Sequence, residues 1–175
     1  MRMGLVHFYY GDGKGKTTAA LGLALRALGY GRQVALVQFL KNTPCGELKA
    51  LARFHDITVL RGKAGGHFSF AMTEAERAQT KGIHEENLAQ AMAMVQSGKC
   101  DLLILDEVTD ALQTGLLDEA LLREAVLKKP DGLELVLTGH GAVDWLVQEA
   151  DYVTEMKKHK HPYDHGVHAR EGVEF

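Results

Sequence analysis

Gly11-Asp12-Gly13-Lys14-Gly15-Lys16-Thr17-Thr18 combines a glycine-rich turn with two lysines and two hydroxyls. The residues before it, 4–10, predict an apolar strand, and those after it predict a helix from about Lys16 to Gly29. In such an arrangement the free backbone amides converge on one point, and the helix dipole favours an anion there. The stretch therefore predicts a site for the phosphates of a nucleotide.

Residues 11–18 are called the phosphate loop, and different residues of this loop are expected to bind different parts of a nucleoside triphosphate. The glycines permit the backbone to surround the phosphate oxygens, and Lys16 is expected to reach the terminal ones. The Thr17 hydroxyl is expected to ligate a Mg²⁺ ion that bridges the phosphates. One departure from the general pattern stands out: its first glycine would fall at position 10, where this sequence has Tyr10.

Two acidic residues supply the second half of the predicted nucleotide site. Residues 102–105 are the most apolar strand candidate, and Asp106 and Glu107 follow at its carboxyl end. Open parallel sheets place their ligands at that end. A carboxylate there can hold Mg²⁺ directly or through water, and Asp106 is the candidate for this role.

Apolar runs of strand length alternate with segments of helical period along the whole chain. Further strands are predicted over 34–40, 57–60, 133–138 and 152–156, and further helices over 73–96, 118–129 and around Trp145. The longest of these helices opens with a capping box, Thr73 and Glu76. This alternation predicts the α/β class, with a mostly parallel central sheet flanked by helices. At 175 residues, the chain 1–175 is expected to be a single domain.

The composition narrows the class of protein. A content of 46% hydrophobic and 25% charged residues is that of a soluble protein, and a net charge of -3 gives no general attraction to polyanions. Because no apolar stretch approaches a bilayer span and no signal-like segment opens the chain, we expect a cytoplasmic protein without membrane or nucleic-acid partners. The two cysteines, Cys45 and Cys100, suit reduced thiols.

A glycine-rich segment, 62–70, carries two phenylalanines in an otherwise flexible setting. Phe68 and Phe70 either anchor this loop on the domain or project toward a large, flat, apolar ligand. The residues themselves leave both interpretations open.

The tail over 157–168 concentrates four of the nine histidines among lysines. Their spacing matches no recognised zinc pattern. The tail is therefore expected to be a ligand-covering or solvated segment rather than a metal site.

Five segments together resemble the ATP:corrinoid adenosyltransferases. They are the phosphate loop, Val37-Gln38-Phe39-Leu40-Lys41, Leu103-Ile104-Leu105-Asp106-Glu107, Thr138-Gly139 and the ending His161-Pro162-Tyr163-Asp164-x-Gly166-x-x-Ala169-Arg170-x-Gly172-Val173-Glu174-Phe175. The resemblance covers nearly the whole chain, includes the late first glycine, and implies a RecA-like P-loop NTPase fold.

The chemistry that the resemblance implies is a step of cobalamin biosynthesis. The 5′-deoxyadenosyl group of ATP is transferred to the cobalt of a corrinoid, and triphosphate is released. Because the nucleophile is the reduced cobalt(I) of the substrate, the protein needs no nucleophilic side chain or general base. Negative charge grows on the departing triphosphate, where the loop amides, Lys16 and Mg²⁺ would stabilise it.

The resemblance also implies roles for individual residues of the nucleotide site. Lys16 and Glu107 are the expected catalytic residues there, and Asp12 and Glu107 are candidates for contacts to the nucleoside. Arg26 matches an arginine that the family keeps near the phosphates. His140 stands where an arginine is usual after Thr-Gly, so the resemblance assigns it no role.

For the corrinoid, the resemblance singles out the aromatic loop. Phe68-Ser69-Phe70 matches a Phe-Thr-Trp segment of the family that lies against the corrin and displaces the lower cobalt ligand, which eases reduction. Phe68 carries over directly as a catalytic and corrinoid-binding residue. Phe70 replaces a tryptophan, and it is expected to bind the corrinoid as well.

Other interpretations of the phosphate loop differ in what attacks the nucleotide. A RecA-like ATPase acting on nucleic acid would use Glu107 to activate water and basic loops to grip DNA. A non-catalytic nucleotide switch would need paired switch loops, for which we find no signature. Under the adenosyltransferase interpretation, the expected partners are an electron donor such as a reduced flavoprotein and a second copy of the chain in a homodimer.

Overall fold

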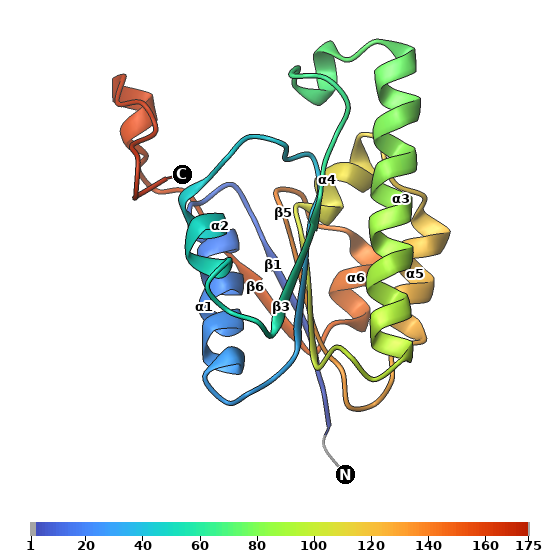
Figure 1. Ribbon diagram of the computed structural model, residues 1–175. Coiled ribbons are helices and arrows are strands. Elements are labelled where there is room, and N and C mark those ends of the chain that lie inside the picture. The colour runs from blue at the N-terminus through green and yellow to red at the C-terminus, as the bar shows by residue number, and fades with distance from the viewer. Residues whose placement is uncertain (1–2, 175) are drawn as a thin grey trace.

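Six parallel strands form one sheet in the computed structural model, which describes residues 3–174. They are β1 (Val6–Tyr10), β2 (Val34–Gln38), β3 (Ile57–Arg61), β4 (Leu102–Asp106), β5 (Glu134–Gly139) and β6 (Tyr152–Glu155). Their order across the sheet is β3-β2-β4-β5-β1-β6 (Figure 1). The predicted α/β class with a parallel central sheet is confirmed.

Helices cover both faces of this sheet (Figure 1). One face carries α1 (Lys16–Leu28) and α2 (Gly46–Leu51), and the other carries α3 (Glu74–Gln96), α4 (Val108–Gln113), α5 (Glu119–Leu127) and α6 (Asp144–Glu149). Two 3₁₀ turns, η1 (Ser69–Ala71) and η2 (Pro162–His165), complete the described elements. Each face buries its own apolar cluster against the sheet, as a two-sided parallel sheet requires. Among residues 3–174, no helix has the length and apolarity to cross a membrane.

The sequence predicted most element boundaries closely, with informative exceptions. The capping box at the start of α3 is confirmed, with Thr73 and Glu76 bonded reciprocally, and the helix continues through Gly82. β2 ends at Gln38 instead of continuing to position 40, because Leu40 turns the chain with a φ of 58°. The six-residue helices α2 and α4 were not predicted, since one and a half turns show too little periodicity.

The strand order explains where a ligand site must lie. The chain leaves β1 and crosses past β5 and β4 to form β2, whereas the connection from β5 crosses past β1 in the opposite direction to form β6. The phosphate loop therefore begins at a point where the direction of the connections across the sheet reverses. Open α/β sheets bind ligands at such switch points, outside the carboxyl ends of the strands. Because all six strands are parallel, the ends of β1, β2, β4 and β5 lie along the same edge.

Candidate functional site

The phosphate loop leaves β1 one residue later than the general pattern because the strand continues through position 10. Tyr10 pairs with Glu155 of β6, its carbonyl accepts the Met156 amide at 2.7 Å, and its ring stacks on Phe8. Gly13 then donates its amide to the Met156 carbonyl at 2.6 Å. A Cβ at Gly13 would lie 2.6 Å from that same carbonyl oxygen, so only glycine permits this approach.

The start of α1 has the properties of an anion site. Gly15 is the N-cap with a φ of 120°, and no side chain caps the first-turn amides. The Lys16 ammonium folds back onto the loop, donating to the carbonyls of Gly11 at 2.6 Å and Gly13 at 2.9 Å. Burial lowers the pKa of Lys16, and nearby carboxylates, Asp110 first, oppose that shift. The loop thus places the Lys16 ammonium beside first-turn amides that no side chain caps, and this arrangement suits a phosphate chain.

Asp106, at the end of β4, is the buried centre of the site. One carboxylate oxygen accepts hydrogen bonds from the hydroxyls of Thr17 and Thr138, both at 2.8 Å. The other lies 2.7 Å from the Lys41 ammonium and 3.5 Å from Gln38 Nε2. All four partners donate to this carboxylate, which fixes its position at the end of β4.

Glu107 and Lys41 form a pair immediately above this centre. The Glu107 backbone has a φ of 61°, and its amide donates to Thr138 Oγ1 at 2.8 Å. Its carboxylate lies 3.1 Å from Lys41 Nζ. Burial raises the pKa of Glu107, while Lys41 opposes the rise. Burial by itself would lower the pKa of Lys41, but Asp106 and Glu107 outweigh it and raise the pKa well above its ordinary value.

Lys41 was not assigned a role from the sequence, although the topology explains its position. The register between β2 and β4 pairs Gln38 with Asp106, so a side chain just beyond β2 lies at the carboxyl end of β4. Knowing which strands are neighbours would have been necessary to find it. The same is true of Thr138, which reaches Asp106 from the end of β5.

His84 stabilises the turn at Leu40, which directly precedes Lys41. Its Nδ1 donates to the Leu116 carbonyl at 2.9 Å, which leaves Nε2 to accept the Leu40 amide at 3.1 Å. The ring is fully buried and packs edge-on against Phe39. Burial lowers the pKa of His84, in keeping with the neutral ring that these two bonds require.

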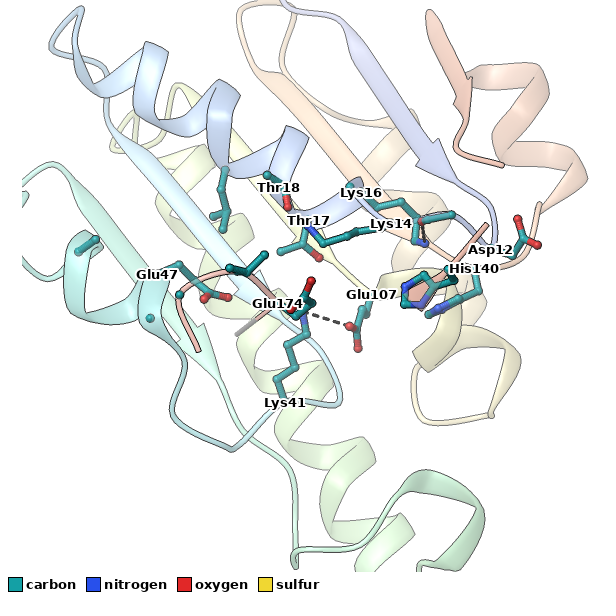
Figure 2. A pocket seen from close by; sticks show the side chains of 18 residues that line it. Asp12, Lys14, Lys16, Thr17, Thr18, Lys41, Glu47, Glu107, His140 and Glu174 are labelled. Carbon is teal, nitrogen blue, oxygen red and sulfur yellow. Dashed lines mark hydrogen bonds and ion pairs between the residues drawn. The ribbon is translucent and has the colours of Figure 1, made fainter. Parts of the chain in front are cut away.

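A cavity of about 830 Å³ opens over these groups (Figure 2). Its walls are the phosphate loop, the start of α1, Lys41, the α2 segment, Glu107, His140 and the tail. Seven residues of the phosphate loop, 12–18, line it, whereas Gly11 is buried beneath them. Candidate residues Lys16, Thr17 and Glu107 therefore meet at one cavity, and Asp106 lies directly below it.

Arg26 is not among the residues that the fold brings to this cavity. It lies in the last turn of α1, ten residues after Lys16, and a helix rises about 15 Å over that distance. The side chain is solvent-exposed, and its charge acts on Tyr9. The lining of this cavity gives no support to the expected contact of Arg26 with the phosphates, which stays a prediction.

The aromatic loop projects from the same edge of the sheet, after β3 (Figure 1). Phe68 is 73% exposed and Phe70 87% exposed, and their rings stack almost parallel with centroids 5.7 Å apart. These rings do not anchor the loop in a core. Instead, hydrogen bonds from two side chains fix the loop backbone. Asn42 Nδ2 donates to the Gly65 carbonyl at 2.6 Å, and the Arg77 guanidinium donates to the Ser69 carbonyl at 3.2 Å.

The tail returns to the phosphate loop after β6. The Lys158 amide donates to the Asp12 carboxylate at 2.9 Å, and this bond is the main reason why the pKa of Asp12 is lowered. His161 and residues 172–174 line the cavity, and Glu174 is bound to Arg170. His161 of the tail, together with residues 172–174 beyond it, therefore forms part of the cavity wall, and a role of the tail in covering a ligand stays a prediction. Phe175, the end of the tail motif, lies outside the described residues.

Comparisons with known proteins match this chain over nearly its full length. The family model for ATP:corrinoid adenosyltransferase BtuR/CobO/CobP matches residues 2–175. A corrinoid adenosyltransferase of Sinorhizobium sp is 33% identical over 173 residues, covering 98% of this chain and 80% of the relative. Proteins of the same name from Escherichia coli K12 and Pseudomonas aeruginosa are 31% and 32% identical, each over 98% of this chain and over 86% and 84% of their own lengths.

Proposed function

Because this chain belongs to the ATP:corrinoid adenosyltransferase family, we propose that it transfers the 5′-deoxyadenosyl group of ATP to the cobalt(I) of a corrinoid. The observation that carries the proposal is the family match over residues 2–175. In this chain the phosphate loop and Glu107 line one cavity, and Asp106 lies below it, bonded to Thr17. It is a transferase in which the corrinoid and ATP are both substrates.

The reaction forms one bond and breaks one. The cobalt(I) electron pair forms a bond to the 5′ carbon of ATP, and the bond from that carbon to oxygen breaks. Its electrons leave with triphosphate, so no proton is removed from the nucleophile and no general base is needed. The protein must hold the reactants in line and stabilise the charge that grows on the leaving group.

We propose that the phosphate loop holds this leaving triphosphate. The support is the uncapped start of α1 and the Lys16 ammonium beside it. Lys16 bonds to the loop carbonyls of Gly11 and Gly13, and binding of ATP would exchange these bonds for bonds to phosphate oxygens. Amides and a cation fixed beforehand at the leaving group cost little reorganisation during the reaction, which is how such sites lower barriers.

The alternative of an ATPase that acts on nucleic acid is not favoured. In that class the residue at Glu107 would activate water, which requires a carboxylate free to accept a proton. Here the carboxylate is paired with Lys41 at 3.1 Å, and Lys41 is shared with Asp106. We propose instead that Glu107 and Asp12 contact the nucleoside, since both line the cavity.

We propose Mg²⁺ as the ion at this site, because a hydroxyl and a carboxylate supply oxygen ligands of the kind that it prefers. Thr17 Oγ1 and an Asp106 oxygen lie 2.8 Å apart, and Gln38 Oε1 is buried without a hydrogen-bond partner in the described chain. Residues 3–174 contain no group of three or more His, Cys, Asp or Glu arranged for a metal. We propose that Thr17 and Asp106 hold Mg²⁺ with phosphate oxygens and water, which would neutralise charge on the triphosphate.

Thr17→Val tests this assignment because it removes the hydroxyl while keeping the shape. We expect the Mg²⁺ concentration for half-maximal binding of a fluorescent ATP analogue to rise about tenfold. Thr17→Ser, which keeps the hydroxyl, is the matched control and should behave like the wild type. Identical Mg²⁺ dependence of the valine and serine variants would remove Thr17 from the ion.

For the corrinoid, we propose that Phe68 and Phe70 form the contact surface. The support is their exposure and parallel stacking on a loop whose backbone is fixed by polar contacts. Two large apolar side chains held in water are costly unless a ligand covers them, and a corrin ring is broad and flat enough to do so.

The chemistry also requires a source of electrons. Because cobalt(I) must be generated, we propose an electron donor such as a reduced flavoprotein, and we propose that the enzyme works in the cytoplasm.

We also propose a homodimer. Its support is the edge strand β6, where Tyr152 and Val153 are exposed beside a single paired neighbour, β1.

The function is tested by mixing the protein with ATP, Mg²⁺ and chemically reduced cobalamin. We expect the cobalt(I) absorbance to disappear only when both ATP and protein are present, with an adenosylated cobalamin as product. Persistence of the cobalt(I) signal while ATP is consumed would contradict the proposal.

A further inference from the structure

His140 occupies a position that the phosphate loop and Asp106 do not explain. It follows β5 directly, and its carbonyl accepts the Gly11 amide at 3.0 Å, which ties it to the phosphate loop. Its side chain lines the same cavity as Lys16 and Thr17 (Figure 2). The imidazole is 64% exposed, so it faces the cavity rather than the core.

Asp110 of α4 fixes the orientation of this ring. One carboxylate oxygen lies 3.0 Å from His140 Nδ1, and the other accepts the His140 backbone amide at 3.2 Å. An ionised carboxylate only accepts hydrogen bonds, so Nδ1 carries a proton in both charge states of the ring. The proton that the ring gains and loses is therefore the one on Nε2. Among residues 3–174, no group forms a hydrogen bond with this nitrogen.

The charged groups around the ring favour its protonated form. The hydrogen bond to Asp110 is the largest cause that raises the pKa of His140, burial opposes it, and Glu107 adds to the rise. Lys16 opposes it from across the cavity. Lys14, His161 and Glu174 line the same cavity, so their charges face the same ligand. A bound polyphosphate would favour the imidazolium further.

We propose that His140 is a further triphosphate ligand, which donates a hydrogen bond from Nε2 to a phosphate oxygen when the ring is protonated and loses this bond when it is not. Asp110 is its positioning residue, because it aims the ring and holds Nδ1 protonated. The inference rests on the proposed use of the phosphate loop for triphosphate. The protein should therefore bind ATP, and the triphosphate product, more tightly at low pH than at high pH.

The test is calorimetric binding of tripolyphosphate and of MgATP to the full chain at pH 6 and pH 8.5. The decisive quantity is the ratio of the dissociation constant of His140→Gln to that of the wild type. Both proteins meet the same ligand at each pH, so the ligand's own titration cancels. We expect a ratio of about ten at pH 6, the scale of one charge-assisted hydrogen bond, and a ratio near one at pH 8.5.

Two variants of the pair complete the design. His140→Arg carries a permanent charge, so its advantage over His140→Gln should persist at pH 8.5. Asp110→Asn, with its histidine intact, should move the loss of affinity to lower pH. Equal ratios at pH 6 and pH 8.5 would overturn the role of His140 and leave the adenosyltransferase proposal standing. A wild type that binds neither ligand at either pH would overturn both.

Discussion

Replacing Lys16 with alanine is expected to lower the rate of adenosyl transfer by about 10² to 10³-fold, the usual loss when one preorganised donor is removed from a transition state. The charge that Lys16 would stabilise grows on triphosphate as its bond to carbon breaks. The loss should therefore be larger in the maximal rate than in ATP affinity, since the ground state carries less charge at that oxygen.

The control must separate this effect from damage to the loop, because Lys16 also bonds the carbonyls of Gly11 and Gly13. Thermal unfolding of Lys16→Ala should stay close to that of the wild type. Lys99→Ala, which removes an exposed lysine away from the cavity, is the matched variant and should keep full activity. Normal turnover by Lys16→Ala would exclude this residue from the mechanism.

Phe68→Ala is expected to slow the reaction that begins with cobalt(II) more than the reaction that begins with cobalt(I) that has already been reduced. A ring that lies against the corrin and displaces its lower ligand assists reduction, whereas cobalt(I) no longer needs that help. Burying a phenylalanine contributes about 1.5–3 kcal/mol, so the cobalt(II) route should slow by about tenfold to a hundredfold.

The matched variant for this experiment is Phe54→Ala, because Phe54 is also partly exposed but lies before β3, away from the aromatic loop. It should support both routes like the wild type. Phe70→Ala should resemble Phe68→Ala to a smaller degree, since its ring stacks on Phe68 and shields it. If Phe68→Ala slows both routes equally, the ring only binds the corrinoid and does not assist reduction.

The nucleotide half of the site was largely predictable because its signals are local. Strand, glycine turn and helix start are adjacent in the chain, and Asp106 with Glu107 ends an apolar strand. The structure brings these segments together through Thr17 and Asp106. The late first glycine was visible in the sequence, but its cause is a distant contact, since Tyr10 stays in β1 by pairing with Glu155 of β6.

The rest depended on contacts between distant segments. Lys41 and Asp106 are 65 positions apart and meet because β2 and β4 are neighbours, an order that no local pattern encodes. Asp110 and His140, 30 positions apart, meet for the same kind of reason. Arg26, which the resemblance alone singled out, lies outside the lining of the cavity, and its contact with the phosphates stays a prediction.

We propose that the phosphate loop holds a leaving triphosphate while the chemistry occurs at carbon. Phosphate products recovered after reaction in ¹⁸O-labelled water test it most directly, because attack at phosphorus by water leaves a label and attack at carbon by cobalt leaves none. We predict one unlabelled, intact triphosphate for each cobalt(I) consumed, with the adenosyl group on cobalt. Labelled orthophosphate in proportion to the ATP consumed would instead show that water attacks phosphorus at this site.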